Sequence, residues 1–311
     1  MSDTFVALDW GTSKLHAYRI HRDSGVVAER KLSVGIASAS RDDMVSAVAE
    51  LIADWPDRDV YASGMIGSNA GWLPVPYLPC PSGLPVLAAN LATTEIGNVG
   101  CRIVPGLSCH SMFDQPEIMR GEELEILGFL ANAVPGDTSE RLLCLPGTHT
   151  KWARASLDAD GNYQVDDFST YMTGELFDLL QKHSLLRGQL TAGSADAGSF
   201  LAGFERGSDA EAGLARQLFG VRARHISGEL SEAASASYCR GLLLGNELRE
   251  VLTTLVPEGS TPTVEIIGNP HLSKLYMLGL QQKGLNANVT QSRDAVVRAF
   301  LEIDSLSGGS Q

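Results

Sequence analysis

The chain has 311 residues, of which 44% are hydrophobic, and its formal net charge is −13 at pH 7. This length predicts two domains with buried cores. The acidic balance and the lack of a long run of Lys or Arg argue against a nucleic-acid-binding surface. The sequence shows neither a cationic leader nor an apolar stretch long enough to span a bilayer, so export and membrane anchoring are not expected.

The cysteines indicate a reducing compartment. Five are present, without any Cys-x-x-Cys spacing, so neither a disulfide framework nor a zinc site is predicted. Reduced thiols in the cytoplasm fit this pattern best. The sequence also lacks a Gly-Lys dipeptide and a Gly-x-Gly-x-x-Gly motif, which excludes a Walker-type phosphate loop and a dinucleotide fingerprint.

The periodicity of apolar residues predicts a mixed α/β chain. In chain order, the expected elements are strands at 5–8, 15–20 and 26–32, a helix at 41–52, a strand at 59–63, an irregular Pro-rich segment at 73–85, a helix at 121–133, strands at 141–145, 151–156 and 162–167, a helix at 174–182, a flexible insertion rich in Gly, Ser and Ala at 188–203, a long helix at 231–252, a strand at 264–267 and a helix at 271–282.

The first motif lies between the first two strands. Asp9 ends an apolar strand, Gly11, Thr12 and Ser13 form the turn, and Lys14 precedes the return strand. Such a turn can direct N–H groups and hydroxyls at a polyphosphate, while the carboxylate holds Mg²⁺ through water. The alternative is an ordinary hairpin, because Gly, Thr and Ser are common turn formers.

A second turn of the same kind follows the strand at 141–145. Gly147, Thr148, His149 and Thr150 form the bend, and Lys151 begins the next strand. Two matching turns far apart in the chain favour phosphate binding and suggest two matching domains.

Two other turns are candidate binding elements. The Gly-rich turn at 64–72 is expected to form a wall of a substrate pocket, where Ser68 and Asn69 bond sugar hydroxyls and Trp72 offers a stacking face; the alternative is a loop with a core tryptophan. The turn after the strand at 264–267 contains Gly268 and Asn269. It is a candidate adenosine site, because a glycine lets the backbone approach a ligand closely, or else a plain strand-to-helix turn.

The residues of these motifs resemble those of the sugar-kinase, hexokinase and actin superfamily, and within it those of the 2-dehydro-3-deoxygalactonokinase family. The resemblance is carried by six blocks that span essentially the whole chain, at 8–13, 63–68, 119–123, 145–152, 172–177 and 266–270.

This resemblance implies an α/β fold of two lobes, each a ribonuclease H-like (actin- or hexokinase-like) mixed sheet flanked by helices, with ATP in the cleft between them. We expect an N-terminal lobe at 1–118 and a C-terminal lobe at 119–311, whose last helix can pack back on the first lobe. The state of oligomerisation is left open.

The activity that the resemblance implies is transfer of the γ-phosphoryl group of ATP to the C6 hydroxyl of 2-dehydro-3-deoxy-D-galactonate, in galactonate catabolism. Asp9 would hold hydrated Mg²⁺, the two turns would bind the β- and γ-phosphates, and Lys14 or Lys151 would offset the developing charge. Arg120 could grip the substrate carboxylate, or it could form a surface salt bridge.

The general base is the least defined part of this hypothesis. Kinases of the superfamily commonly carry an aspartate near the second phosphate loop, and no acid stands there in this sequence. Glu122 or Glu123 is favoured over His149, although acidic residues also suit the first turn of any helix. Glu175 could bind sugar hydroxyls or cap its helix. The alternatives to the named activity are a kinase of the same fold for another sugar or sugar acid, and a non-catalytic actin-like nucleotide-binding protein.

Overall fold

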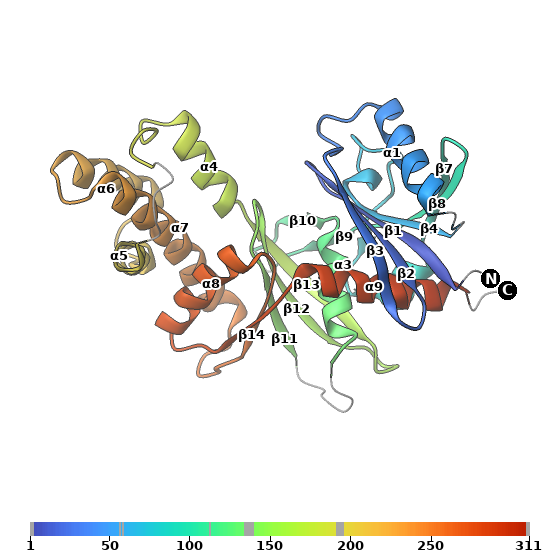
Figure 1. Ribbon diagram of the computed structural model, residues 1–311. Coiled ribbons are helices and arrows are strands. Elements are labelled where there is room, and N and C mark those ends of the chain that lie inside the picture. The colour runs from blue at the N-terminus through green and yellow to red at the C-terminus, as the bar shows by residue number, and fades with distance from the viewer. Residues whose placement is uncertain are drawn as a thin grey trace. The chain divides into compact units, whose positions relative to one another are not determined.

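The computed structural model describes residues 3–55, 57, 59–111, 113–133, 140–190 and 196–308. Figure 1 shows the elements in chain order. The chain forms two compact units: unit 1 comprises 1–140, 153–168 and 290–311, and unit 2 comprises 141–152 and 169–289. This division differs from the boundary at residue 118 expected from the sequence, because the chain passes between the units several times.

The main sheet of unit 1 has the strand order β3-β2-β1-β4-β8-β7. Its strands are β1 (Thr4–Trp10), β2 (Leu15–His21), β3 (Gly25–Leu32), β4 (Val60–Gly64), β7 (Ala92–Ile96) and β8 (Val99–Ile103). Strand β1 pairs antiparallel with β2 and parallel with β4. The carboxyl ends of β1 and β4, at the Asp9 and Gly64 motifs, therefore lie at the same edge of the sheet.

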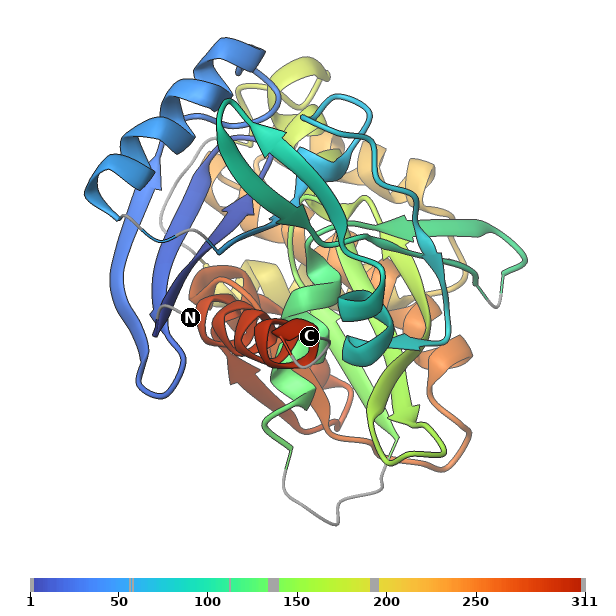
Figure 2. The same cartoon turned by 90° about the vertical axis from the view of Figure 1, so that its right-hand side faces the viewer.

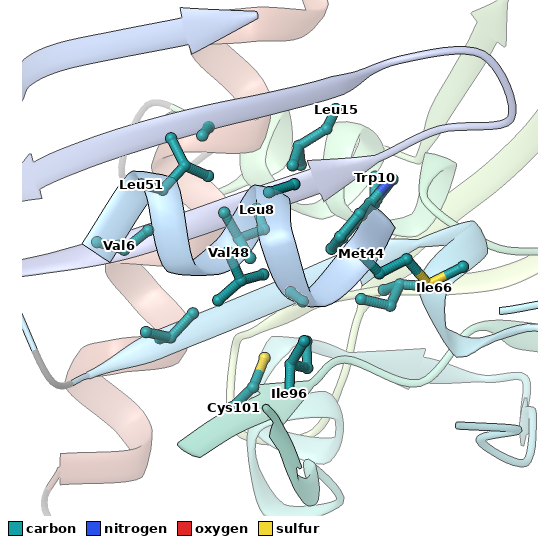
Figure 3. Close-up of a cluster of buried hydrophobic side chains, with 14 of the residues drawn as sticks. Val6, Leu8, Trp10, Leu15, Met44, Val48, Leu51, Ile66, Ile96 and Cys101 are labelled. Carbon is teal, nitrogen blue, oxygen red and sulfur yellow. The ribbon is translucent and has the colours of Figure 1, made fainter. Parts of the chain in front are cut away.

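Helix α1 (Arg41–Asp54) covers this sheet with an apolar face. Its residues Met44, Val48 and Leu51 pack with Leu8 and Trp10 of β1 in one buried cluster, which Figure 3 shows in close-up. Ser40 begins the helix with a capping box, in which its hydroxyl and the Asp43 carboxylate satisfy one another's backbone N–H groups. The strand that leads into the turn after Asp9 thus packs into a buried core.

The segment between β4 and α3 holds short elements that sequence periodicity did not predict. Besides β7 and β8 of the main sheet, they are the 3-10 turn η1 (Met65–Gly67), strands β5 (Leu78–Pro79) and β6 (Ser82–Gly83), helix α2 (Leu84–Ala89), and strands β9 (Leu107–His110) and β10 (Pro116–Met119). Strands β10, β9 and β5 form a small sheet in that order. Two-residue strands carry too little alternation for a pattern to be read.

Helix α3 (Glu122–Leu130) packs along α9 (Ser292–Gly308) within unit 1, as Figures 1 and 2 both show. A Cβ added at Gly128 would lie only 1.9 Å from the carbonyl oxygen of Ala295. A glycine at this point therefore permits the close approach of the two helices, and it supports the start of α3, where several candidate site residues lie.

The third sheet has the order β15-β14-β11-β12-β13-β6. It adds β11 (Arg141–Leu145), β12 (Thr150–Leu157), β13 (Tyr163–Tyr171), β14 (Val264–Ile267) and β15 (Ala287–Thr290). Strand β11 pairs parallel with β14, so the second phosphate turn and the Gly268 turn both follow the carboxyl ends of neighbouring strands. Helix α8 (Pro270–Gln282) continues from the second of these turns.

The helices of unit 2 are α4 (Thr173–His183), α5 (Ala197–Ser208), α6 (Leu214–Ile226) and α7 (Glu232–Leu255). The prediction of a flexible insertion at 188–203 was wrong for residues 197–203, which begin α5; residues 191–195 lie outside the described part. The glycines there serve helix packing, because a Cβ at Gly203 or Gly207 would lie 2.0 Å from a carbonyl oxygen of α7. Gly241 and Gly245 of α7 approach α5 as closely. Among the described residues, we find no helix that has both the length and the apolar character of a membrane span.

Candidate functional site

Asp9 is the last but one residue of β1 and pairs across the sheet with Ser63. Gly64, which follows Ser63, has a φ of +82°, and a Cβ there would lie 2.8 Å from the carbonyl oxygen of Trp10 and 3.6 Å from Oδ1 of Asp9. Only glycine fits this turn without strain. Burial and the charge of Glu122 raise the pKa of Asp9 to about 6, so this carboxylate favours the approach of a cation.

The turn after Asp9 is held from behind by the segment that follows β3. Backbone N–H groups of Ile36 and Ala37 donate to the carbonyl oxygens of Gly11 and Thr12, at 3.2 and 3.0 Å. Thr12, Ser13 and Lys14 remain exposed. The hydroxyls and the ammonium group therefore face solvent from a turn that the chain itself supports.

The start of α3 lies against the Gly64 turn. Gly121 has a φ of +111°, and a Cβ there would lie 3.5 Å from the Cα of Gly64. Both carboxylate oxygens of Glu123 accept from the N–H of Gly121, at 2.9 and 2.7 Å, and burial raises the pKa of Glu123 to about 8. Glu122 accepts from the N–H of Arg120 at 3.1 Å and stays partly exposed. Glu123 thus stabilises the turn, whereas Glu122 remains accessible beside Asp9.

Arg120 carries buried N–H groups that lack a protein acceptor. Its side chain is 9% exposed, its Nη2 donates to the carbonyl oxygen of Val75 at 2.5 Å, and its guanidinium carbon lies 4.3 Å from the centre of the Tyr77 ring. Nε and Nη1 have no hydrogen-bond partner in the described part of the chain. A Cβ at Gly67 would lie 2.8 Å from Nη1, so a glycine is required to seat the guanidinium. An unpaired buried guanidinium suits a planar anion such as a carboxylate.

In the turn at 64–72, Ser68 and Asn69 differ from Trp72 in their surroundings. Ser68 donates to the carbonyl oxygen of Met65 at 2.7 Å, and Asn69 is exposed. Trp72 donates to the carbonyl oxygen of Glu95 at 3.0 Å and carries the guanidinium of Arg41 over its ring, 4.1 Å from the ring centre. Trp72 packs against the unit 1 core, which matches the alternative of a core tryptophan more closely than that of a stacking face.

In unit 2, the start of α4 packs on the second phosphate turn. A Cβ at Gly174 would lie 2.3 Å from the carbonyl oxygen of Gly147, and the N–H of Glu175 donates to the carbonyl oxygen of Thr148 at 2.9 Å. Nε2 of His149 lies 2.5 Å from Oε2 of Glu175, so these two predicted site residues form one pair. The block around Gly174 therefore supports the turn.

Two further residues of this turn point into unit 2. Thr150 is fully buried, and Lys151 is 5% exposed and donates to the hydroxyl of Thr170 at 2.9 Å. Lys151 is thus anchored within unit 2.

A cavity of about 230 Å³ opens beside the second phosphate turn. Its walls come from that turn and from helices α4, α5, α7 and α8, and are lined by Gly147, Thr148, Thr173, Gly174, Phe177, Asp178, Phe200, Arg240, Leu243, Leu244, His271, Leu272, Leu275 and Tyr276. The guanidinium carbon of Arg240 lies 4.0 Å from the centre of the Phe177 ring. A largely apolar cavity next to a phosphate-binding turn suits the base and ribose of a nucleotide. Sequence reasoning missed Phe177 and Arg240 as site residues, because each looks like an ordinary helix residue.

A buried carboxyl group ties the walls of this cavity together. Glu247 of α7 accepts from Nε1 of Trp152 at 2.7 Å, from the hydroxyl of Tyr276 at 3.0 Å, and from the hydroxyl of Thr173. The Tyr276 hydroxyl also lies 2.7 Å from that of Thr150. Burial raises the pKa of Glu247 to about 7 despite these donors. No sequence motif contains Glu247, and only the packing of α7 brings it to the site.

The Gly268 turn contacts the second phosphate turn directly. A Cβ at Gly268 would lie 3.4 Å from Cδ of Pro146. Asn269 has a φ of −66°, and its side chain accepts from the N–H of His271 at 2.8 Å, so it is the N-cap of α8.

The whole chain is similar to known sugar-acid kinases. The family model described as 2-keto-3-deoxy-galactonokinase matches residues 9–303. The 2-dehydro-3-deoxygalactonokinase of Escherichia coli strain K12 is 32% identical over 286 residues, covering 91% of each chain. A Sinorhizobium meliloti protein provisionally identified as a 2-dehydro-3-deoxygalactonokinase has a crystal structure that matches with a TM-score of 0.86 and 30% identity, covering 97% of this chain and 98% of that one.

A more distant structure agrees in fold alone. Component A of the (R)-2-hydroxyglutaryl-CoA dehydratase from Acidaminococcus fermentans matches with a TM-score of 0.52 and 11% identity, covering 98% of this chain and all of that one. The mixed sheets flanked by helices confirm the expected α/β fold. The chain belongs to the 2-keto-3-deoxy-galactonokinase family, and it is a kinase.

Proposed function

We propose that the protein transfers the γ-phosphoryl group of ATP to the C6 hydroxyl of 2-dehydro-3-deoxy-D-galactonate, giving ADP and 2-dehydro-3-deoxy-6-phospho-D-galactonate in galactonate catabolism. Membership in the family and the name of the Escherichia coli relative support this substrate. The free thiols of all five cysteines support a cytoplasmic enzyme.

The observation that carries the proposal is the guanidinium of Arg120, which is 9% exposed and whose Nε and Nη1 have no hydrogen-bond partner among the described residues. We assign these groups to the substrate carboxylate. A neutral sugar would leave them unpaired and buried, at a cost of about 1–3 kcal/mol or more, so the site would select an acid over an aldose. Ser68 and Asn69, close in sequence to Gly67, are assigned to the sugar hydroxyls.

Asp9 suits a hydrated Mg²⁺ ion. Mg²⁺ is commonly held by one or two carboxylates together with water and substrate phosphates. In the described ranges we find no group of three or more acidic, His or Cys side chains that could hold a metal, so Asp9 would share the ion with the nucleotide. When bound, Mg²⁺ neutralises charge on the β- and γ-phosphates. A cation would also relieve the electrostatic strain that raises the pKa of Asp9.

Glu122 is assigned as the general base. It lies close enough to Asp9 to raise the pKa of that residue, and it keeps some exposure, whereas both oxygens of Glu123 bond the turn at Gly121. A base must reach the proton that it accepts, and a fully bonded, buried carboxyl cannot do so without breaking the turn. His149 is less suitable because it pairs with Glu175.

Each phosphate turn is a candidate nucleotide-binding element of its own unit. In unit 1, Gly11, Thr12, Ser13 and Lys14 would bind phosphate oxygens. In unit 2, Gly147, Thr148, His149 and Thr150 would do so, with Lys151 offsetting charge from its buried position. The cavity beside Gly147 and Thr148 would take the adenosine, supported from the far side by Gly268 and Asn269.

The test is a coupled assay of ADP release across a panel of 2-keto-3-deoxy sugar acids, aldonic acids and neutral aldoses, with the phosphorylated carbon of the product identified by NMR. We expect 2-dehydro-3-deoxy-D-galactonate to give the highest kcat/KM, with phosphate on C6. A better acid of another stereochemistry would move the assignment to that acid, and a better neutral aldose would contradict the role of Arg120.

A further inference from the structure

Two cysteines of unit 1 lie close to each other: Cys80 directly follows β5, and Cys109 lies in β9, the neighbouring parallel strand. Leu78 of β5 pairs with Leu107 of β9, and Pro79 pairs with Ser108. The N–H groups of Leu78 and Cys80 donate to the carbonyl oxygens of Gly106 and Ser108, at 2.9 and 2.8 Å. This regular alternation continues the register by one step and places Cys80 opposite Cys109.

Opposite residues of adjacent strands suit a disulfide. Neighbouring strands lie about 4.8 Å apart, which is within the Cα separation of roughly 4.4–6.8 Å found across disulfides. Directly opposite side chains also emerge on the same face of a parallel pair. The thiols of Cys80 and Cys109 are near enough for each to shift the pKa of the other.

The five cysteines differ in their solvent accessibility. Cys80 and Cys109 are partly exposed, whereas Cys101, Cys144 and Cys239 are buried. The hydrogen bond donated by Cys80 lowers the pKa of the Cys109 thiol and raises that of Cys80. The thiol of Cys109 lies 3.4 Å from the carbonyl oxygen of Phe168, so its position is held from a second side. A thiolate is the nucleophile in disulfide exchange, which makes Cys109 the attacking group.

We propose that Cys80 and Cys109 are a reversible oxidation site, at which a disulfide oxidant such as oxidised glutathione joins β5 to β9. The Cys109 thiolate attacks one sulfur of the oxidant and releases one molecule of reduced glutathione. The Cys80 sulfur gives up its proton to solvent, attacks the Cys109 sulfur of the mixed disulfide, and releases the second molecule. Two protein thiols are oxidised to one disulfide while one glutathione disulfide is reduced to two thiols.

The test uses the full chain in glutathione buffers of increasing oxidised fraction, followed by thiol counting and by peptide mass analysis without reduction. We expect two of the five thiols to be lost, the peptides of Cys80 and Cys109 to be joined, and dithiothreitol to restore all five. An unchanged thiol count under conditions that oxidise a dithiol reference peptide overturns the proposal, as does a joined pair that includes another cysteine.

Two variants separate the roles of the sulfurs. Cys80→Ser keeps a donor beside Cys109, so Cys109 should stop at the mixed disulfide with glutathione. Cys109→Ser removes the attacking thiolate, and glutathionylation of Cys80 should be at least severalfold slower than that of Cys109 in the first variant. Equal rates in the two variants would contradict the proposed order of attack. Loss of secondary structure by circular dichroism would identify a folding defect, and the wild-type peptide map would then decide alone.

Discussion

Carboxyl groups and a buried guanidinium lie near the ends of β1 and β4 in unit 1, whereas mainly apolar side chains line the cavity of unit 2, with the buried Glu247 bonded to two of its lining residues. Asp9, Glu123 and Glu125 of unit 1 all have raised pKa values, chiefly because burial disfavours their charge. In unit 2, Glu247 receives three hydrogen bonds that offset part of the same cost. Unit 1 thus keeps electrostatic strain that a cation or substrate can relieve, while in unit 2 the protein itself supplies donors to Glu247.

The largest expected effect comes from neutralising Asp9. Asp9→Asn should lower kcat by about 100-fold or more, because a metal ion contributes several kcal/mol of charge stabilisation in the transition state. The fold should remain, since Asn replaces a carboxylate whose charge burial disfavours. Steady-state kinetics at saturating Mg²⁺ check this, with the turn variant Asp160→Asn as the control. Wild-type turnover in a folded Asp9→Asn protein would remove Asp9 from the metal site.

Arg120→Met tests the charge selection of unit 1. We expect sugar-acid binding to weaken by about 1.5–3 kcal/mol, the range for hydrogen bonds to charged groups, with nucleotide affinity nearly unchanged. Separate titrations of the two ligands measure this, and the exposed Arg293→Met is the matched control. If the variant instead lost nucleotide affinity, Arg120 would be a phosphate ligand, and the carboxylate would have to be sought elsewhere.

Glu247→Gln tests the hydrogen-bond network of unit 2. The amide N–H₂ group would take the place of the oxygen that accepts from Thr173 and Tyr276, so these hydroxyls lose their hydrogen bonds to the carboxylate, at a cost of about 1–3 kcal/mol. Thr173 and Tyr276 line the cavity, and the KM for ATP should therefore rise about tenfold, with the sugar-acid KM little changed. Glu250→Gln, one turn further along α7 and exposed, is the control. Equal loss in both variants would point to a general defect of α7.

A larger side chain at Gly268 should also raise the KM for ATP, because it would displace the second phosphate turn. An added Cβ would meet Pro146 at 3.4 Å, so Gly268→Ala should be tolerated and Gly268→Leu should displace the turn. We expect the leucine variant to raise the KM for ATP severalfold more than the KM for the sugar acid. Similar changes in both constants would argue against a nucleotide role for this turn.

The smallest expected effect is a pH dependence of stability in unit 1. Burial raises the pKa of Glu125 to about 8, so between pH 5 and 8 the folded state binds more protons than the unfolded state and stability falls as pH rises. Glu125→Gln should flatten this fall and raise Tm at pH 8, by about 2–4 °C for each kcal/mol. Thermal melts of both proteins from pH 5 to 8 measure the difference. An unchanged slope would show that Glu125 titrates normally.

The sequence by itself determined those features of the site that depend only on residues close together in the chain. The turn at 11–13 and the turn at 147–150 are set by short-range chemistry: an apolar strand ends, and small or hydroxyl residues bend the chain. The strands and helices with sustained periodicity were also predicted, among them α1 and α7. The six motif blocks were sufficient to indicate the family that the comparisons confirmed.

Only the tertiary structure decided which residues meet. Arg240 and Phe177 reach the cavity because α7 and α4 pack around it, and Glu247 of α7 bonds the lining residues Thr173 and Tyr276. The environments of Glu122 and Glu123 differ only in the folded structure, where Glu123 is buried and bonds the N–H of Gly121 while Glu122 stays partly exposed. Likewise, Gly203, which the sequence placed in a flexible insertion, proved to lie in a close contact between α5 and α7, together with Gly207, Gly241 and Gly245. Long-range packing selects among residue types that local pattern leaves equivalent, which is the physical reason that these features could not be read from the sequence.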